Sequence, residues 1–338
     1  MPAARALLFS LLILATPLSA VLLVRAEEYT GKTVRIMVGA SAGGGYDREA
    51  RLLARHLGRH LPGTPRVVVD DVPGAGGLVA ASTFARVTPP DGLTIGYFPF
   101  GVMAAQVLGQ TATQYDVRQF EILGSPYADR HVCAFSVSTG ITSIERWRAM
   151  KRPVRLGSTG RDSIMYVFPS MLKAALGLNA EIITGYKGST EVRLAITTGE
   201  LDGACIAWGG LKAGWPDRRG LAVVLQSGSE SDPELRDVPL ALASATTPAA
   251  RALLGPVATA MSVGGRLYAF PPRTPPHLTA VMAGAFLATV RDPAYVQEAR
   301  GANIANEFTT AADMRVRMDA LFALPADVLA LLRRAVGN

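Results

Sequence analysis

The stretch VRIMVGASAGGGYDREARLLARHL, residues 34–57, points to the fold class. Its first five residues form an apolar run that predicts a strand, and a glycine-rich loop follows. Beyond the loop, Ala50, Leu53 and Leu57 recur at helical spacing, and Asp47 is expected to cap the helix by accepting hydrogen bonds from its first backbone amides. Strand, loop and helix in this order form the repeating unit of a parallel sheet.

The same alternation continues along the chain. Further strands are predicted at 66–71, 94–98, 132–137, 154–157, 181–184 and 203–207, and further helices at 78–86, 144–150, 164–176, 191–198 and 276–291. Loops rich in glycine or serine follow strands at 39–47, 73–77, 157–163 and 185–189, where open parallel sheets bind ligands. Two of these loops lie early and two lie mid-chain, so we expect an α/β protein with two lobes facing each other across a cleft.

The expected division places a signal peptide at 1–26, the first lobe at 27–130 plus 227–338, and the second lobe at 131–226. The last helices are expected to pack on the first lobe. Arg5, an apolar run over 7–14 and small residues before Glu27 are typical of a cleaved secretory signal, with an uncleaved membrane anchor as the alternative. We therefore expect a periplasmic protein that is soluble after export.

Composition excludes several classes of protein. The chain is 49% hydrophobic and 18% charged, as in ordinary globular proteins. Its net charge of +7 includes Arg5 and Arg25 of the signal segment, and its other arginines are scattered outside any nucleic-acid motif. A mild positive field of this kind favours a small anionic ligand over nucleic acid.

Cysteine and histidine give no sign of a metal or catalytic site. Cys133 and Cys205 lie in separate apolar runs, which favours buried free cysteines, although export permits a disulfide. His56 and His60 are four residues apart on one helix, but they lack the H-E-x-x-H pattern and are expected on a solvated face. No cofactor, metal ion or catalytic residue is predicted.

Three functions compete for the glycine-rich loop. Gly39 to Gly43 spells G-x-S-x-G, the pattern of a hydrolase nucleophile elbow at Ser41, but no earlier strand is expected to supply an oxyanion hole. A nucleotide site is disfavoured because the loop has no P-loop lysine and Asp47 would repel phosphate. Backbone amides at a helix N-terminus bind carboxylates well, which makes a carboxylate the favoured ligand.

Three segments carry a family resemblance: the opening stretch, then PRVVVDDVPGAGGLVAASTFARVTPPDGLTIGY, then YKGSTEVRLAITTGELDG. In order and spacing they resemble the solute-binding proteins of tripartite tricarboxylate transporters, the Bug family. The resemblance implies a type II-like two-lobed periplasmic binding protein that captures a small organic carboxylate and passes it to membrane permease subunits. It also implies that the backbone of residues 42–47, with ordered waters, holds one carboxylate.

The resemblance extends to the other loops. The turn at 73–77 is either a ligand contact or a tight turn before a helix, Lys187 is either a ligand contact or solvated, and Trp208 either stacks on the ligand or lies in the core. Ser189 is expected to place a hydroxyl cap and free amides at the far end of the ligand. The candidate ligand-binding residues are Ser41, Ala42, Gly43, Gly44, Tyr46, Asp47, Gly76, Gly77, Ser158, Thr159, Ser163, Tyr186, Lys187, Gly188, Ser189 and Trp208.

Departures from the family pattern leave the ligand open. Gly185 replaces the usual proline before Tyr186, and Arg161 and Asp162 add charges to the serine loop. The predicted function is carboxylate capture for uptake by a monomeric, non-enzymatic protein. The alternatives are a sensor that presents its ligand to a membrane receptor kinase and, less favoured, an exported hydrolase that uses Ser41.

Overall fold

The structure is a computed structural model that describes residues 28–99, 101–110, 113–127, 130–161, 163–215, 219–228, 230–255, 266–304 and 306–337. The predicted signal peptide therefore lies outside the described residues. None of the helices in the described ranges combines the length and hydrophobicity needed to cross a membrane.

Strands and helices alternate through most of the chain. The strands are β1 (Thr33–Val38), β2 (Arg66–Asp71), β3 (Thr94–Pro99), β4 (Glu121–Gly124), β5 (His131–Ser136), β6 (Val154–Gly157), β7 (Ala180–Ile183), β8 (Gly203–Ala207), β9 (Leu221–Gln226) and β10 (Arg266–Phe270). The α-helices are α2 (Gly45–Leu57), α3 (Leu78–Val87), α4 (Gly101–Val107), α5 (Ile144–Arg148), α6 (Ile164–Leu176), α7 (Ser189–Thr197), α8 (Trp208–Gly214), α10 (Pro276–Arg291), α11 (Pro293–Gly301), α12 (Ala311–Phe322) and α13 (Ala326–Val336).

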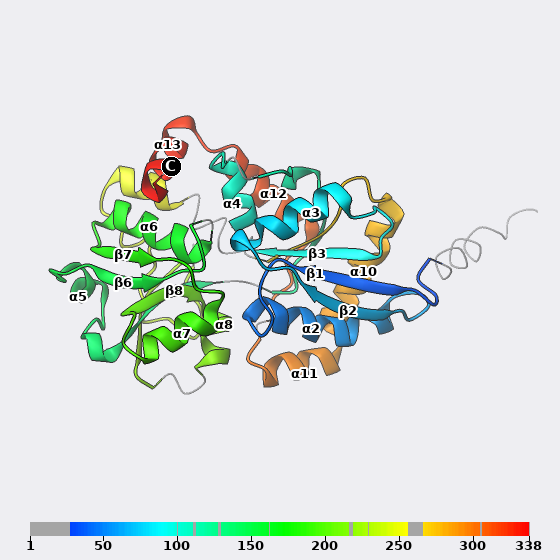
Figure 1. Cartoon of the computed structure of the whole chain (residues 1–338), viewed down its shortest axis with the longest axis horizontal. Helices are drawn as coiled ribbons and strands as arrows, with labels where there is room; N and C mark the ends of the chain where they lie inside the picture. The colour runs from blue at the N-terminus through cyan, green and yellow to red at the C-terminus, as the bar shows by residue number, and fades with distance from the viewer. Residues whose placement is uncertain are drawn as a thin grey trace, which may run out of the picture.

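Two five-stranded sheets form two lobes, seen side by side in Figure 1. The first sheet has the order β2-β1-β3-β10-β4 and the second the order β7-β6-β8-β5-β9. In each sheet a single strand, β10 or β5, runs antiparallel to its neighbours, and it lies next to one edge. The prediction of two mainly parallel sheets is confirmed, and the two lobes share one strand plan.

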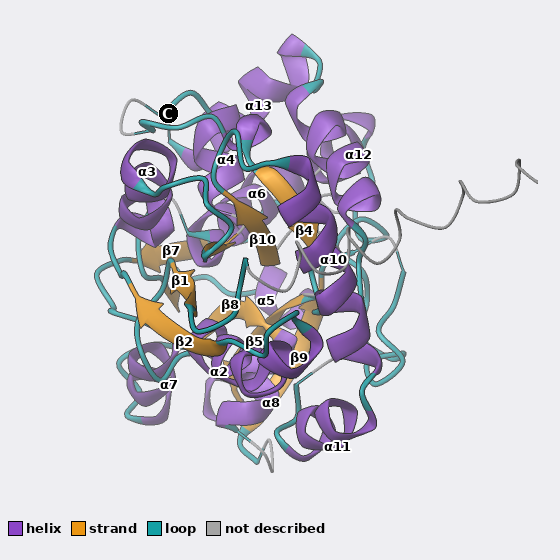
Figure 2. Cartoon of the chain, turned by 90° about the vertical axis from the view of Figure 1, so that its right-hand side faces the viewer, coloured by secondary structure: helices purple, strands orange, loops and turns teal. Residues whose placement is uncertain are grey.

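Helices cover both faces of the first sheet. Figure 1 and Figure 2 both place α3 and α4 on one side of it and α2 and α11 on the other. Burial follows from the sequence pattern: Val34, Ile36 and Val38 of β1 are fully buried and alternate with more exposed residues. Because β1, β2 and β3 are parallel, the loops after them meet at one edge, where α2 and α3 begin.

Two segments that the sequence prediction assigned to the first lobe contact the second lobe. After β9, the chain stays with the second sheet, since Gln226 pairs with Leu240 in an isolated parallel bridge and its side-chain amide donates to two further carbonyl groups. At the C-terminus, α12 packs on β4 as expected, but α13 packs on α6 of the second lobe. Arg333 of α13 also donates to the Leu108 carbonyl at 3.1 Å, so this helix links the two lobes.

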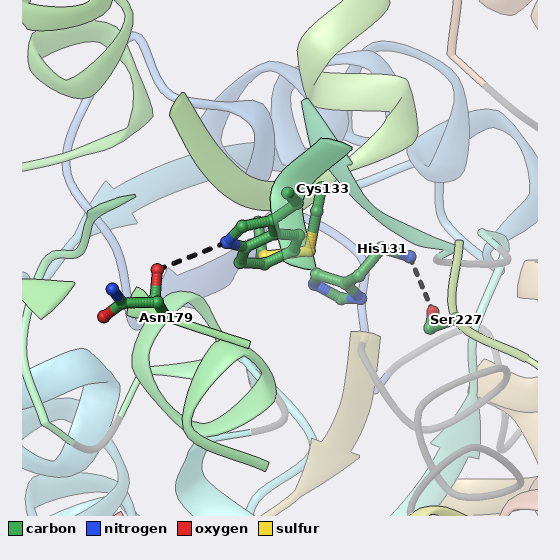
Figure 3. Close-up of a disulfide and its surroundings, with 6 residues drawn as sticks. His131, Cys133, Asn179 and Ser227 are labelled. Atoms are coloured by element: carbon green, nitrogen blue, oxygen red, sulfur yellow. Dashed lines mark hydrogen bonds between the residues drawn. A yellow bond between two sulfur atoms is a disulfide. The ribbon is translucent and has the colours of Figure 1, made fainter. Parts of the chain in front are cut away.

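The two cysteines form a disulfide, and the prediction of free cysteines is wrong. Cys133 of β5 and Cys205 of β8 are directly paired across antiparallel strands, with their Cα atoms 3.9 Å apart. Figure 3 shows the bond beside the indole of Trp147, which donates a hydrogen bond to the Asn179 carbonyl oxygen. The sequence could not reveal this pairing because 72 residues separate the two positions.

Candidate functional site

The glycine-rich loop of the first lobe touches the second lobe. Ser41 Oγ donates a hydrogen bond to the Lys187 carbonyl oxygen at 2.8 Å. Gly45, at the start of α2, faces Gly210 of α8 so closely that a Cβ on Gly45 would lie 4.0 Å from the Gly210 Cα. Loops that lie 146 residues apart in sequence therefore meet between the lobes.

Asp47 does not cap α2, contrary to the sequence prediction. The N-cap residue is Gly44, and Asp47 lies buried in the first turn. One of its carboxylate oxygens accepts from the Gly43 amide at 2.7 Å, and the other pairs with Arg51 at 2.6 Å. Asp47 therefore holds the glycine loop in shape, while the exposed Ala42 lies at the tip of the loop.

The turn at 73–77 supports the glycine loop from behind. Gly76 and Gly77 have φ angles of 63° and 102°, a conformation that favours glycine. A Cβ on Gly77 would lie 3.0 Å from Pro99 Cδ and 3.1 Å from the Gly39 carbonyl oxygen. Close packing therefore requires glycine at position 77, whether or not the ligand reaches this turn.

In the second lobe, the serine hydroxyls of the loop before α6 bond to each other. Ser158 Oγ and Ser163 Oγ lie 2.8 Å apart, and each lies 3.0 Å from the Gly160 carbonyl oxygen, so one hydroxyl donates to the other and the second donates to this carbonyl. Thr159 lies partly exposed between them. Arg161 places its guanidinium 5.7 Å from the centre of the Tyr166 ring, and Asp162 lies outside the described residues.

The loop before α7 contributes mainly backbone. The Tyr186 hydroxyl bonds to Glu200, and burial together with this carboxylate raises the pKa of the phenol to about 12. Helix α7 starts at Ser189 with Gly188 as its N-cap, so the predicted hydroxyl cap at Ser189 is wrong. The side chain of Lys187 is exposed, whereas its backbone carbonyl oxygen accepts the hydrogen bond from the Ser41 hydroxyl.

Trp208 belongs to the core of the second lobe. It is 3% exposed, begins α8, and lies 5.4 Å under the Lys212 ammonium group. Of the two interpretations of this residue, the structure supports the buried one.

Three helices that begin at the site lack a side-chain cap. Within the described residues, α2, α6 and α7 have no side chain that accepts from their first amides. The described helices α3, α8, α10 and α13 also lack a side-chain cap, whereas α5, α11 and α12 are capped by Ser143, Asp292 and Thr310. Because uncapped amides carry the positive end of the helix dipole, the site offers donors for an anion from both lobes.

A buried charge pair behind the first loop escaped the sequence analysis. Arg266 of β10 and Glu49 of α2, exposed by 2% and 6%, pair at 2.7 Å. The Tyr97 hydroxyl also bonds to Glu49, and the Arg266 guanidinium lies 4.2 Å from the centre of the Tyr46 ring. Tyr46 therefore packs on this pair. No local pattern reveals it, because residues 49 and 266 meet only through the pairing of β10 with β3.

The two lobes differ in the protonation of their buried carboxylates. Burial and the charge of Asp47 raise the pKa of Asp71 to about 6, although Arg51 opposes them. Burial also disfavours ionised Asp202, but hydrogen bonds from Arg152 and Arg155 outweigh it and lower the pKa to about 2. The carboxyl group of Asp71 therefore holds its proton to a higher pH than that of Asp202 does.

The histidines make their contacts away from the loop that carries Ser41. Contrary to the predicted solvated face, His56 is 4% exposed and contacts Glu298 at 2.6 Å, and His60 contacts Asp292 at 3.0 Å. His277 pairs with Glu28, and His131 lies buried on β5. Among the described residues, no histidine hydrogen-bonds to Ser41, and no group of three or more His, Cys, Asp or Glu side chains is arranged to hold a metal ion.

Comparison of the sequence with known proteins finds distant relatives. No family model matches the chain. Over 185 residues the chain is 26% identical to a UPF0065 protein of Agrobacterium vitis, in an alignment that covers 53% of this chain and 52% of the relative. The chain thus spans about half the length of the curated relative that it matches.

Solved structures match nearly the whole chain. The periplasmic binding protein BugD gives a TM-score of 0.73 at 20% identity, covering 91% of this chain and 98% of BugD. A protein of R. palustris solved with adipate gives 0.72 at 20% identity, covering 89% of this chain and 98% of that protein. The chain therefore has the two-lobed fold of periplasmic binding proteins. Within that class, the resemblance to Bug-family proteins is confirmed.

Proposed function

We propose that this chain is a periplasmic solute-binding protein that captures a small organic carboxylate and delivers it to the permease of a tripartite tricarboxylate-type transporter. The observation that carries the proposal is the arrangement of uncapped helix starts. Helix α2 of the first lobe and α6 and α7 of the second present free amides at the edges where the lobes meet through Ser41 and Lys187.

The chemistry of the site favours a carboxylate over a neutral ligand. A carboxylate accepts several backbone hydrogen bonds and gains from the dipoles of the helices, whereas an amide or ester lacks the full charge. The likeness to the adipate-bound protein supports the same ligand class. We propose that the residues predicted from the sequence line this site, with Tyr46, Asp47, Gly77, Tyr186 and Trp208 packed behind it.

A hydrolase that uses Ser41 receives no support from the geometry. The Ser41 hydroxyl donates to a backbone carbonyl, and a catalytic serine needs a base that accepts its proton. In the described part of the chain no such base contacts it. We therefore expect Ser41→Ala to weaken ligand binding by about tenfold at most, because it removes one neutral hydrogen bond.

A thermal-shift panel tests the proposal. Dicarboxylates, tricarboxylates, acidic amino acids and aromatic acids are compared with their own methyl esters and amides. An acid present at about a hundred times its dissociation constant stabilises the fold by roughly 2.7 kcal/mol, which raises the Tm by several degrees. Equal stabilisation by the esters and amides would show that the site binds a neutral group.

A further inference from the structure

The surface where α2 of the first lobe faces α8 of the second, at Gly45 and Gly210, is called the seam. It holds two arginines close to the contact between Ser41 and Lys187. Helices α2 and α8 approach each other there, at Gly45 and Gly210, and Figure 1 places both helices at the centre of the molecule. One helical turn further along each helix come Arg48 on α2 and Gly214 on α8. Because residues three or four apart share a helix face, both positions lie along the same seam.

The Gly214 position is covered by Arg193 of α7. A Cβ added to Gly214 would lie 1.1 Å from Arg193 Nη1 and 2.2 Å from its Cζ, so the guanidinium rests directly on the α8 backbone. Arg193 also lines a surface hollow of about 380 Å³ together with Thr190, Thr197 and Trp215. The seam thus holds one arginine from each lobe, and the second of them lies beside open space.

Neither arginine has an anionic partner among the described residues. No hydrogen bond or ion pair joins either side chain to a described group, and Arg48 Nε is buried without an acceptor. The carboxylates close to them in sequence are already engaged. Asp47 pairs with Arg51, and Glu191 accepts from a backbone amide at 2.8 Å.

The two cations also disfavour each other. Burial, and after it the charge of Arg48, lower the pKa of Arg193. Partly buried cations without a counter-ion are unfavourable, and bringing the two lobes together increases their repulsion. Guanidinium groups match the geometry of carboxylate and phosphate oxygens, so an oxyanion between them would satisfy both.

We propose that Arg48 and Arg193 bind one anionic group between them, an arginine from each lobe, and that this group favours the closed arrangement of the lobes. The group is a carboxylate or phosphate-like oxyanion. It is supplied either by a second acidic group on the bound ligand or by a separate small anion. A separate anion would bind there whether or not the helix starts hold a carboxylate, whereas an acidic group supplied by the ligand rests on the proposed function.

Calorimetric titration of the full-length mature protein tests the proposal, in buffers free of other oxyanions and at constant ionic strength. Inorganic phosphate serves as the probe of a separate anion. Adipate and its monomethyl ester serve as the probe of a second acidic group. Arg48→Gln, Arg193→Gln and the double variant are compared with Arg300→Gln, which changes an exposed arginine on α11 away from the seam.

If a separate anion binds, phosphate affinity falls at least tenfold in each seam variant and is unchanged in Arg300→Gln. If the ligand supplies the anion, the preference for adipate over its monoester falls at least tenfold instead. The loss of affinity in the double variant should be smaller than the product of the two single losses, because both arginines share one group.

The proposal is overturned if both probes bind wild type and seam variants alike, or not at all, or if only one of the two arginines matters. Its failure is distinguishable from failure of the proposed function. A protein that binds no carboxylate at its helix starts would still show phosphate binding that depends on both arginines.

Discussion

The two lobes share a strand plan but support their ligand loops differently. In the first lobe, the glycine loop rests on a buried ion pair, Arg266 with Glu49, and on Asp47. In the second lobe, a disulfide lies in the sheet, and the 186–189 loop is partly exposed. We infer that the first lobe fixes where a carboxylate binds, while the second lobe adapts to it.

The largest effect should come from breaking the buried pair. Arg266→Met leaves the Glu49 carboxylate buried without its cation and is expected to lower the free energy of unfolding by about 3–5 kcal/mol. Chemical denaturation measures the change. The double variant Glu49→Leu/Arg266→Met should recover part of the loss, because no charge remains buried. A double variant less stable than Arg266→Met would contradict this explanation.

Removal of the disulfide should cause the next largest loss of folding stability. Replacing both cysteines by alanine is expected to cost about 2–4 kcal/mol, because the bond closes a long loop in the unfolded chain and both side chains are fully buried. The wild-type protein under reducing conditions is the matched control. If the reduced wild type unfolds at the same denaturant concentration as the oxidised protein, the second lobe does not depend on this bond.

Asp202 should have a smaller, pH-dependent effect. Asp202→Asn removes the charge that accepts from Arg152 and Arg155 and should cost roughly 1–2 kcal/mol at pH 7. Since the folded pKa is lowered from 3.8 to about 2, this contribution is complete above pH 4 and is lost as the pH falls through that window. A wild type and variant with parallel stability profiles from pH 5 to pH 2 would refute the role of the charge.

The contribution of Asp71 to folding stability should change with pH in the opposite direction to that of Asp202. Its folded pKa of about 6 lies above the ordinary value of 3.8, so the folded chain holds the proton more tightly than the unfolded chain. The protonated carboxyl favours folding at acid pH, and this contribution fades as the pH rises from about 4 to about 6. Asp71→Asn should flatten this slope and raise stability at pH 7 by roughly 1 kcal/mol. An unchanged slope counts against the effect.

The sequence was sufficient to predict those strands and helices that have a clear local pattern of apolar residues. Beta-branched and apolar runs marked β2, β6 and β8 at their observed bounds, and apolar periodicity with flanking loops marked α6 and α10. It missed β4, β9 and β10, which are set by pairing with distant strands. Residue pattern cannot show that β10 inserts between β3 and β4 after a return from the other lobe.

The candidate site was proposed from its loops, and its side-chain contacts could not be predicted from the sequence. Glycine and serine content located four loops, and the structure brings Ser41 and Lys187 together. The predicted caps at Asp47 and Ser189 were wrong because the N-cap residues of α2 and α7 are Gly44 and Gly188, three residues and one residue earlier. Arg48 and Arg193 gave no sequence signal, since an isolated charge on a helix is ordinary until its partners are known.

We propose that the uncapped helix starts hold the carboxylate of the ligand, and one substitution tests this central claim directly. Gly188, the N-cap of α7, has extended backbone angles and open space around its Cβ position, so aspartate fits there without strain. An aspartate would accept from the first amides of α7 and place a negative charge in the site.

Calorimetric titration with the acid that stabilises the protein most is the measurement, with Gly188→Ala as the control that adds a side chain without a cap. Gly188→Asp should leave the fold as stable as wild type or slightly more stable, and should weaken binding at least thirtyfold, about 2 kcal/mol. Gly188→Ala should bind within a few-fold of wild type. If Gly188→Asp binds the acid as tightly as Gly188→Ala does, the α7 amides do not hold the carboxylate and the central claim is wrong.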